Sequence, residues 1–342
     1  MHNNLQAKTL KKSVIFSLLL ITSILLASCK NNVEPTTTSG FKFNTYISIT
    51  AYSKVDSVVL DKCLELCDTY ENLYSRTIES STLSKVNNHG ITEIPGELAT
   101  LIQYGIQYGD LSKGTFDITI GSVSSLWDFT SNNPQVPAPS TIQSALAYVN
   151  YKNISLEKKP GSDDTYIVSI PQGTMIDLGA IAKGYIADKL KEYLLDNGVT
   201  SALINLGGNV LCVGDKPDNT SFNIGVKKPF SESGEILVTL KINDKSIVSS
   251  GSYERCFTKD GQFYHHILNP STGYPYDNQL TSVTIISDSS VQGDCLSTTC
   301  FTLGLDDGLK LIESLNGIEA IFVTSDNQIH YSSGASKYIV NR

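Results

Sequence analysis

Two neighbouring histidines, His265 and His266, stand in the segment FYHHILNPSTGYP, residues 263–275, and the whole chain contains only five histidines. Neighbouring side chains of an extended segment point to opposite faces, so the pair is poorly placed to bind one metal ion. We expect one ring to face inward and the other outward. Because imidazole titrates near neutral pH, the inward ring could accept a proton from a reacting hydroxyl. The segment therefore predicts either an acid–base group or a structural histidine.

A second set of candidate residues lies in the segment GDCLSTTCFTLG, residues 293–304. Asp294 and Thr298 are four residues apart where we expect a helix near residues 292–303, so both side chains project from one face. Magnesium prefers oxygen ligands and is often held by one carboxylate together with phosphate and water oxygens. The structural alternative is that Asp294 offsets the helix dipole and that Thr298 is packed. Spacing alone favours this alternative.

A helix with an open first turn is expected within residues 177–198. The apolar residues that recur at helical intervals are Ile181, Tyr185, Ile186, Leu190, Tyr193 and Leu194. The helix should begin near Gly179 or Ala180, where small residues would let an anion approach unpaired backbone N–H groups. Asp177 could then accept a hydrogen bond from a ligand, and Lys183 could neutralise a phosphate. An aspartate cap and a solvated lysine would explain the same two residues equally well.

Strand and helix patterns are mixed along the chain without a regular alternation. Apolar spacing predicts helices at residues 55–74, near 292–303 and near 306–315. The stretch GTFDITIG, residues 114–121, could be a tight turn that enters a strand, with Phe116 as a core aromatic. Alternating or β-branched runs predict strands at residues 41–52, 166–171, 201–208, 235–242, 246–257, 281–287 and 319–326. This pattern predicts an α+β fold.

Length and charge limit the possible functions. About 300 residues follow the amino-terminal segment, which is enough for one large domain or for two closely packed lobes. No Pro-, Gly- or Ser-rich linker divides them. The formal net charge of -8 and the pI near 5.2 argue against nucleic-acid binding, because phosphates require a basic surface.

The first residues resemble a secretory signal. An apolar run over residues 14–26 follows several lysines and is too short to span a bilayer comfortably. It leads into Leu-Ala-Ser-Cys, residues 26–29, which resembles the lipobox of bacterial lipoproteins. The resemblance predicts a signal peptide over residues 1–28 and lipidation of Cys29. The alternative is an ordinary cleaved signal with an accidental cysteine.

The predicted lipoprotein would be anchored in the bacterial cell envelope. Residues 29–39 are rich in Asn, Thr and Ser and suit a flexible tether, and residues 40–342 would form the folded domain. We expect this domain to face the periplasmic or extracytoplasmic side and to contact the membrane only through its lipid.

Six cysteines remain apart from Cys29. Their even number permits disulfides in an exported protein, but their spacing imposes no framework. Cys63 and Cys67 are four residues apart in a helical pattern, so both should face the core. No CxxC motif or zinc-like pairing with the histidines occurs. We interpret the six as mostly buried small apolar groups.

Six sequence blocks, in order, resemble the successive motifs of the ApbE family. This resemblance covers roughly residues 40–340 and is more specific than any single glycine motif. The blocks are GTFDITIG with LWDF (114–129), DLGAIAKGYIAD (177–188), LINLGGNV (203–210), SSGSYER (249–255), YHHILNPSTGYP (264–275) and GDCLSTTCFTLG (293–304).

The resemblance implies an FAD:protein FMN transferase, and many such enzymes are exported lipoproteins. A member would split FAD with the help of Mg²⁺, pass the FMN phosphate to a threonine or serine hydroxyl of a target protein, and release AMP. The family fold is a single α+β domain of two mixed α/β lobes with FAD between them. The implied partners are FAD and an exported acceptor protein with a Thr/Ser flavinylation motif.

The resemblance also implies roles for particular residues. His266 would be the inward histidine beside the phosphate, catalytic together with Asp294, whereas His265 would be structural or solvated. Since alanine has no side-chain ligand, Ala180 could bind Mg²⁺ only through its backbone carbonyl. The implied metal ligands are Ala180, Asp294 and Thr298. The implied FAD contacts are Phe43, Thr77, Thr115, Phe116, Asp117, Asp177, Lys183, His266 and Ile267.

Two positions depart from the family pattern. The family often has methionine where Phe43 stands, although an apolar contact would survive this change. Many members have aspartate where Asn269 stands, which weakens any acid–base role for residue 269; the residues around it are expected to form a turn.

Two other functions are compatible with the residues. A plain FAD pyrophosphatase would use water as the nucleophile in the same site and yield FMN and AMP. A non-catalytic lipoprotein could bind FAD without cleaving it. The joint presence of Asp294, Thr298 and His266 favours an enzyme.

Overall fold

The structure, a computed structural model, describes residues 34–231 and 233–340. The predicted signal peptide, residues 1–28, and the predicted lipidation site, Cys29, lie outside the described residues. Residues 35–342 form one compact unit. Its first strand already begins at Thr36, so the last four residues of the predicted tether belong to the sheet.

The largest element of the fold is an antiparallel sheet of eight strands in the order β1-β2-β6-β7-β10-β13-β14-β15. The strand β13 is buried along its whole length because both faces of the sheet are covered. The strands are β1 (Thr36–Lys42), β2 (Thr45–Ala51), β6 (Ala202–Leu206), β7 (Asn209–Val213), β10 (Ser246–Gly251), β13 (Leu280–Ser287), β14 (Glu319–Thr324) and β15 (Ile329–Tyr331).

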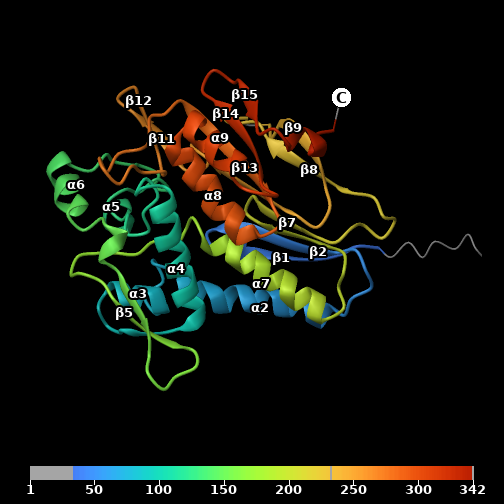
Figure 1. Cartoon of the computed structure of the whole chain (residues 1–342), viewed down its shortest axis with the longest axis horizontal. Helices are drawn as coiled ribbons and strands as arrows, with labels where there is room; N and C mark the ends of the chain where they lie inside the picture. The colour runs from blue at the N-terminus through green and yellow to red at the C-terminus, as the bar shows by residue number, and fades with distance from the viewer. Residues whose placement is uncertain (1–33, 232, 341–342) are drawn as a thin grey trace, which may run out of the picture. The chain divides into compact units, whose positions relative to one another are not determined.

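Helices cover one face of this sheet, and a β-hairpin covers the other. Figure 1 shows α2, α7 and α8 crossing in front of the strands. The alternation within β13 fits the two layers, since Ile285 packs in the helical core and Ile286 in the core under the hairpin. The covering elements are α2 (Ser57–Tyr74), α7 (Ala182–Asp196), α8 (Ser290–Leu303), α9 (Leu305–Glu313) and the hairpin β8 (Phe222–Lys227) with β9 (Ile236–Ile242).

A smaller lobe is formed mainly by the chain between α2 and α7. It contains a three-stranded sheet in the order β3-β5-β4 and several short helices. Its elements are α3 (Thr82–Asn87), β3 (Glu93–Pro95), α4 (Gly96–Leu111), α5 (Gly121–Ser124), α6 (Pro139–Leu146), the 3₁₀ turn η1 (Tyr151–Asn153), β4 (Ser155–Lys158) and β5 (Thr165–Ser169).

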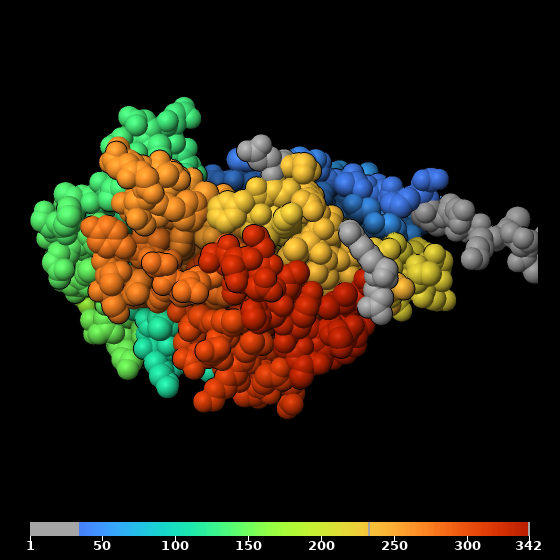
Figure 2. Space-filling view, turned by 90° about the horizontal axis from the view of Figure 1, so that it is seen from above, coloured from blue at the N-terminus to red at the C-terminus, as the bar shows by residue number. Residues whose placement is uncertain are grey.

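A second hairpin, β11 (Cys256–Lys259) with β12 (Gln262–His265), connects the two lobes. Figure 2 shows this segment, in orange, against the green residues of the smaller lobe. Trp127 is the centre of the contact: its ring lies 5.6 Å from that of Tyr264, and its indole nitrogen donates to the Gly273 carbonyl at 3.1 Å. The hairpin therefore places the segment after His265 between the lobes. A 3₁₀ turn, η2 (Ala335–Tyr338), follows the last strand.

The α+β fold predicted from the sequence is confirmed, including the helices α2, α8 and α9 and most strands. The six cysteines are free, and all except the partly buried Cys256 are buried, as expected. Three local predictions were wrong. Residues 41–52 form a hairpin instead of one strand, α7 begins at Ala182 instead of near Gly179, and residues 114–120 form turns without entering a strand.

The hairpin within residues 41–52 has a local cause. Phe43 and Asn44 both have positive φ, 54° and 57°, which a tight two-residue turn between antiparallel strands requires. Asparagine tolerates this conformation, whereas phenylalanine adopts it rarely. The alternating pattern on both sides of the turn is continuous, so it concealed the reversal.

Candidate active site

All residues that the sequence resemblance nominates line one cavity of about 720 Å³. They come from both lobes and from segments far apart in the chain. They are Phe43, Thr77, Thr115, Phe116, Asp117, Asp177, Ala180, Lys183, His266, Ile267, Asp294 and Thr298. The fold thus brings the whole set together.

The buried carboxylate of Asp294 lies where α7 meets α8. The Gly184 N–H donates to Asp294 Oδ2 at 2.8 Å. A side chain at Gly184 would not fit, because a Cβ there would be 2.3 Å from the Ser290 carbonyl oxygen and 2.7 Å from Asp294 Cβ. The absence of a side chain at Gly184 therefore lets α7 pack against this carboxylate.

The same contact releases the backbone carbonyl of Ala180. In a regular helix the Gly184 N–H would donate to the residue four positions earlier, which is Ala180. It donates to Asp294 instead, and among residues 34–231 and 233–340 no backbone N–H bonds the Ala180 carbonyl. This carbonyl oxygen therefore remains available to a ligand. The family resemblance implied such a role for Ala180, which could bind a metal ion only through its backbone.

Thr298 lies one turn after Asp294 on α8 and also faces the cavity. Its hydroxyl is 3.0 Å from the Ser250 hydroxyl. In the described part of the chain no group of three or more His, Cys, Asp or Glu side chains could hold a metal ion. A cation here would therefore use one carboxylate, a hydroxyl and a carbonyl together with ligand oxygens, a set that suits Mg²⁺.

The charge state of Asp294 depends on opposing effects. Burial raises the pKa of Asp294, and the positive charge of Lys183, the Gly184 N–H and the Asn209 amide oppose this rise. The carboxylate is thus held in a site that disfavours its charge unless a cation is present.

The two histidines differ sharply in environment. The side chain of His265 is buried; its Nε2 donates to the Tyr276 carbonyl at 2.9 Å, and its Nδ1 accepts from the Ile267 N–H at 3.3 Å. Both ring nitrogens are engaged, which confirms the structural alternative for His265. His266 lines the cavity instead, and its buried Nδ1 has no hydrogen-bond partner in the part of the chain that the structure describes.

The expectation that His266 titrates near neutral pH was wrong for the protein alone. Burial, helped by the positive charge of Arg255, lowers the pKa of His266 to about 3. Its ring is therefore neutral at physiological pH. So low a pKa makes the ring a weak base in the protein alone, and the negative charge of bound phosphates would raise its pKa toward the range that a general base needs.

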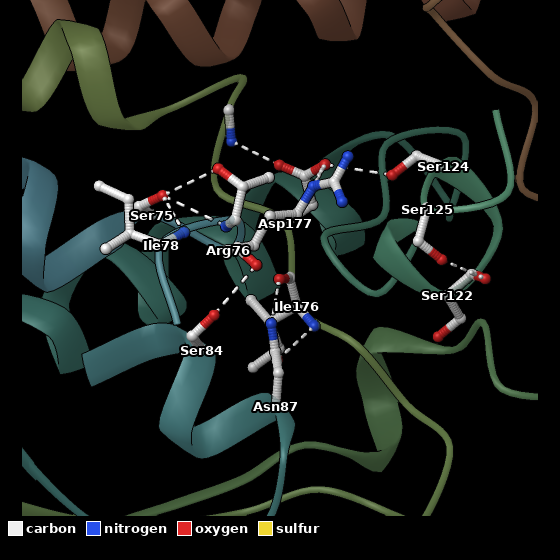
Figure 3. A network of polar contacts seen from close by, with 12 residues as sticks. Ser75, Arg76, Ile78, Ser84, Asn87, Ser122, Ser124, Ser125, Ile176 and Asp177 are labelled. Carbon is white, nitrogen blue, oxygen red and sulfur yellow. Dashed lines mark hydrogen bonds and ion pairs between the residues drawn. The ribbon is translucent and has the colours of Figure 1, made fainter. Parts of the chain in front are cut away.

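Asp177 is held by protein donors and does not cap α7. Its carboxylate accepts from Arg76 Nε at 2.7 Å, from the Ser124 hydroxyl at 3.2 Å and from the Gly179 N–H at 2.9 Å. Figure 3 shows this network of polar contacts between the segment after α2 and the segment before α7. Arg76 also lines the cavity, so it presents positive charge beside Asp177. No motif in the sequence marked Arg76.

Asp117 lines the cavity, but its carboxylate is used within the protein. It accepts from the N–H and hydroxyl of Thr119 at 2.7 and 2.6 Å and from the Tyr151 N–H at 3.0 Å. These bonds fix the turns of residues 114–120. Thr115, next to them, hydrogen-bonds Thr302 across the cavity wall at 3.0 Å. The GTFDITIG block therefore shapes the wall, and the strand expected from it does not form.

The cavity carries more positive groups than the sequence indicated. Lys183 was expected, whereas the other cationic residues in the lining had no distinctive spacing. They are Arg76, Lys227 and Arg255. Positive charge at several points of a partly buried cavity suits a ligand with a pyrophosphate.

Comparisons with known proteins agree on one family. The model of the ApbE family matches residues 43–322. An FAD:protein FMN transferase of Klebsiella pneumoniae is 37% identical over 283 residues, which cover 81% of this chain and 86% of the relative. A second FAD:protein FMN transferase, from Treponema pallidum, is 29% identical over 306 residues, which cover 85% of this chain and 84% of the relative.

Solved structures show the same fold. The ApbE protein of Thermotoga maritima superimposes with a TM-score of 0.81 at 30% identity, covering 90% of this chain and all of that one. The flavin transferase ApbE of Vibrio cholerae gives a TM-score of 0.76 at 23% identity, and the match covers 89% of this chain and 99% of that one.

Proposed function

Since this chain belongs to the ApbE family and is an FAD:protein FMN transferase, we propose that it uses Mg²⁺, held by Asp294, Thr298 and the Ala180 carbonyl, to transfer FMN to a threonine or serine hydroxyl. The observation that carries this proposal is that these three oxygen donors and the His266 ring line one cavity. Bound there, Mg²⁺ would neutralise charge on the FAD pyrophosphate.

The remaining groups account for the transfer itself. The His266 ring accepts the proton of the acceptor hydroxyl as the hydroxyl oxygen attacks the FMN phosphorus. The bond between this phosphorus and the bridging oxygen breaks, and AMP leaves with that oxygen. Lys183 and Arg255 line the same cavity and favour the phosphates electrostatically. The products are an acceptor with FMN in phosphoester linkage, AMP and one proton, so atoms and charge balance.

The test combines the enzyme, FAD, Mg²⁺ and an exported candidate acceptor that carries a Thr/Ser flavinylation motif. We expect flavin fluorescence to appear on the acceptor in a denaturing gel, with one AMP released per FMN attached. Omitting Mg²⁺ should stop both signals. FMN and AMP released at the same rate with and without acceptor would instead favour the pyrophosphatase reaction with water.

Arg76 provides a separate test of the Asp177 side of the cavity. Asp177 is implied to contact FAD, and Arg76 holds its carboxylate through a charge-assisted hydrogen bond at 2.7 Å. Such bonds contribute about 1.5 to 3 kcal/mol, so Arg76→Ala should weaken FAD binding by about tenfold or more. Fluorescence titration of FAD would measure the change.

Two variants give this experiment its controls. Arg76→Lys keeps the charge but not the geometry of Nε, so it should recover only part of the affinity. Lys159→Ala breaks an exposed ion pair with Glu93 in the smaller lobe and should leave FAD affinity unchanged. If Arg76→Ala bound FAD as tightly as the wild type does, the Arg76–Asp177 pair would have only a structural role.

We further propose that Cys29 carries a lipid and that the enzyme is anchored in the bacterial cell envelope, with its catalytic unit facing the extracytoplasmic side. The proposal is supported by the lipobox-like residues 26–29, which follow an apolar run. Within residues 34–231 and 233–340 no helix is long and apolar enough to cross a membrane.

Replacing the cysteine tests the anchor directly. Cys29→Ala should release most of the protein from the membrane fraction, while the purified enzyme keeps its full rate in solution. Fractionation followed by mass analysis of the amino terminus would check both. A Cys29→Ala protein that stays with the membrane would contradict the lipid anchor.

A further inference from the structure

Asn209 is a buried polar residue behind the cavity wall with one unpaired side. Only 1% of its surface is exposed, and it does not line the cavity. Its Oδ1 accepts from the Ser290 hydroxyl at 2.8 Å. Its Nδ2 has no hydrogen-bond partner among the described residues. A buried amide donor without a partner is costly, so its position calls for a physical reason.

The orientation of the Asn209 amide is fixed by a chain of hydroxyl groups. The Ser246 hydroxyl donates to Ser290 Oγ at 3.0 Å, which leaves the hydrogen of Ser290 free to donate onward to Asn209 Oδ1. Reversing the amide would turn an N–H group toward this hydroxyl hydrogen. The chain therefore directs Nδ2 away from Ser290.

The backbone around Asn209 is equally constrained. Asn209 is the first residue of β7 and pairs with Leu206 across a two-residue turn formed by Gly207 and Gly208. Both glycines have positive φ, 64° and 94°, and a Cβ at Gly207 would lie 2.4 Å from Thr45 Cγ2. A side chain at Gly207 would collide with Thr45, so the turn that leads into Asn209 requires glycine at this position.

The group that the unpaired side of Asn209 approaches is Asp294. Ser290, which bonds Asn209 Oδ1, stands one turn before Asp294 on α8. A Cβ at Gly184 would touch both the Ser290 carbonyl oxygen and Asp294 Cβ, so these two residues present the same face of α8 to the region where Asn209 lies. One oxygen of Asp294 accepts from the Gly184 N–H. A carboxylate has about four lone-pair sites, so a second donor leaves room for a cation.

We infer that Asn209 is a positioning residue for the proposed metal site: its unpaired Nδ2 is available to donate to Asp294 and would orient the carboxylate that would hold Mg²⁺. The inference rests on the proposed role of Asp294 as the metal ligand. The Gly184 N–H and the Asn209 amide then hold Asp294 from two different elements, α7 and β7. Outer partners of this kind commonly change metal affinity by about tenfold to a hundredfold when they are removed.

The experiment measures Mg²⁺ binding without turnover. Protein free of FAD is heated at increasing Mg²⁺ concentrations, and the concentration that gives half of the rise in melting temperature is compared among variants. Asn209→Leu keeps a similar volume and removes the donor, and it should raise this concentration by about tenfold or more. Ser290→Ala keeps Asn209 but removes the group that orients it, so it should raise the same concentration by less.

A matched control separates this effect from general loss of buried polarity. Ser282, in β13, is also buried and its hydroxyl is unpaired among the described residues. It does not belong to the hydrogen-bonded series Ser246–Ser290–Asn209. Ser282→Ala should leave the half-saturating Mg²⁺ concentration unchanged. A lower melting temperature without Mg²⁺ in any variant reports packing alone and does not enter the comparison.

The possible outcomes separate a failure of the proposed metal site from a failure of the role inferred for Asn209. If Asp294→Asn retains the Mg²⁺-dependent rise, the metal site itself is wrong, and the role of Asn209 falls with it. If Asp294→Asn loses the rise but Asn209→Leu and Ser290→Ala both keep the wild-type half-saturating concentration, only the role of Asn209 is overturned. Should Asn209→Leu fail to fold, Ser290→Ala decides between the two.

Discussion

Replacing His266 by alanine is expected to lower turnover by about a hundredfold to ten-thousandfold, the usual range for loss of a general base. His266 lines the cavity, and its ring is neutral at working pH, so the ring can receive the proton of the acceptor hydroxyl. FAD and Mg²⁺ should still bind, because the proposed contacts to both come mainly from other residues. AMP release in a single turnover and a separate FAD titration would measure the two effects.

His265 provides the matched control for this variant. Both of its ring nitrogens are hydrogen-bonded inside the protein, so His265→Ala should lower the melting temperature. Its rate per folded molecule should fall far less than that of His266→Ala. Equal losses per folded molecule, or a weaker FAD affinity that explains the whole defect of His266→Ala, would contradict the assignment.

The pH dependence gives an independent test of His266. Its pKa is lowered to about 3 by burial, so in the free enzyme the neutral ring dominates at every pH well above that value. The proton-accepting form is then not lost between pH 8 and pH 5, and kcat/KM should show no acidic limb from His266 in this range. A limb with its midpoint near pH 6.5 that disappears in His266→Ala would show that the ring titrates normally.

The cavity lining could be predicted from the sequence because each motif block lies at the end of an element or in a connection. The pairs Asp177 with Lys183 and Asp294 with Thr298 are close in sequence, so a single helix or its entry determines their spacing. The resemblance then supplied their order around the ligand. The structure places them as expected around one cavity.

The hydrogen-bond partners of these residues could not be predicted in the same way. Arg76 and Asp177 are 101 positions apart, and Gly184 and Asp294 are 110 apart. Which groups meet across such separations depends on how the helices and lobes pack. For the same reason the sequence did not show that Asp117 turns its carboxylate toward Thr119 and Tyr151.

The pKa of His266 could not be predicted from the residue type alone. A histidine in a sequence has the pKa of the free side chain until its surroundings are known. Burial and the positive charge of Arg255 lower the pKa of His266 to about 3, so the ring stays neutral. The residue was identified correctly as a member of the cavity, whereas its titration could only be obtained from the packed structure.

The second large effect is expected for Asp294→Asn, which should reduce transfer by at least about 10³-fold, equivalent to about 4 kcal/mol of lost transition-state stabilisation. Asparagine has nearly the same shape and can still accept the Gly184 N–H, so the contact between α7 and α8 should survive. What it lacks is the negative charge, and no other carboxylate is proposed as a ligand of this Mg²⁺. AMP release should therefore fall and should no longer respond to Mg²⁺ over the range that saturates the wild type.

The control for Asp294→Asn is Asp188→Asn. Asp188 also accepts backbone hydrogen bonds at the start of α8, from Ser290 at 2.8 Å and Val291 at 3.0 Å, but it does not line the cavity. Its loss should lower the melting temperature and should change the Mg²⁺ dependence of the rate far less than Asp294→Asn does. If Asp294→Asn kept wild-type turnover at saturating Mg²⁺, the required cation would have to be bound elsewhere, and Thr298 and the Ala180 carbonyl would lose their proposed role with it.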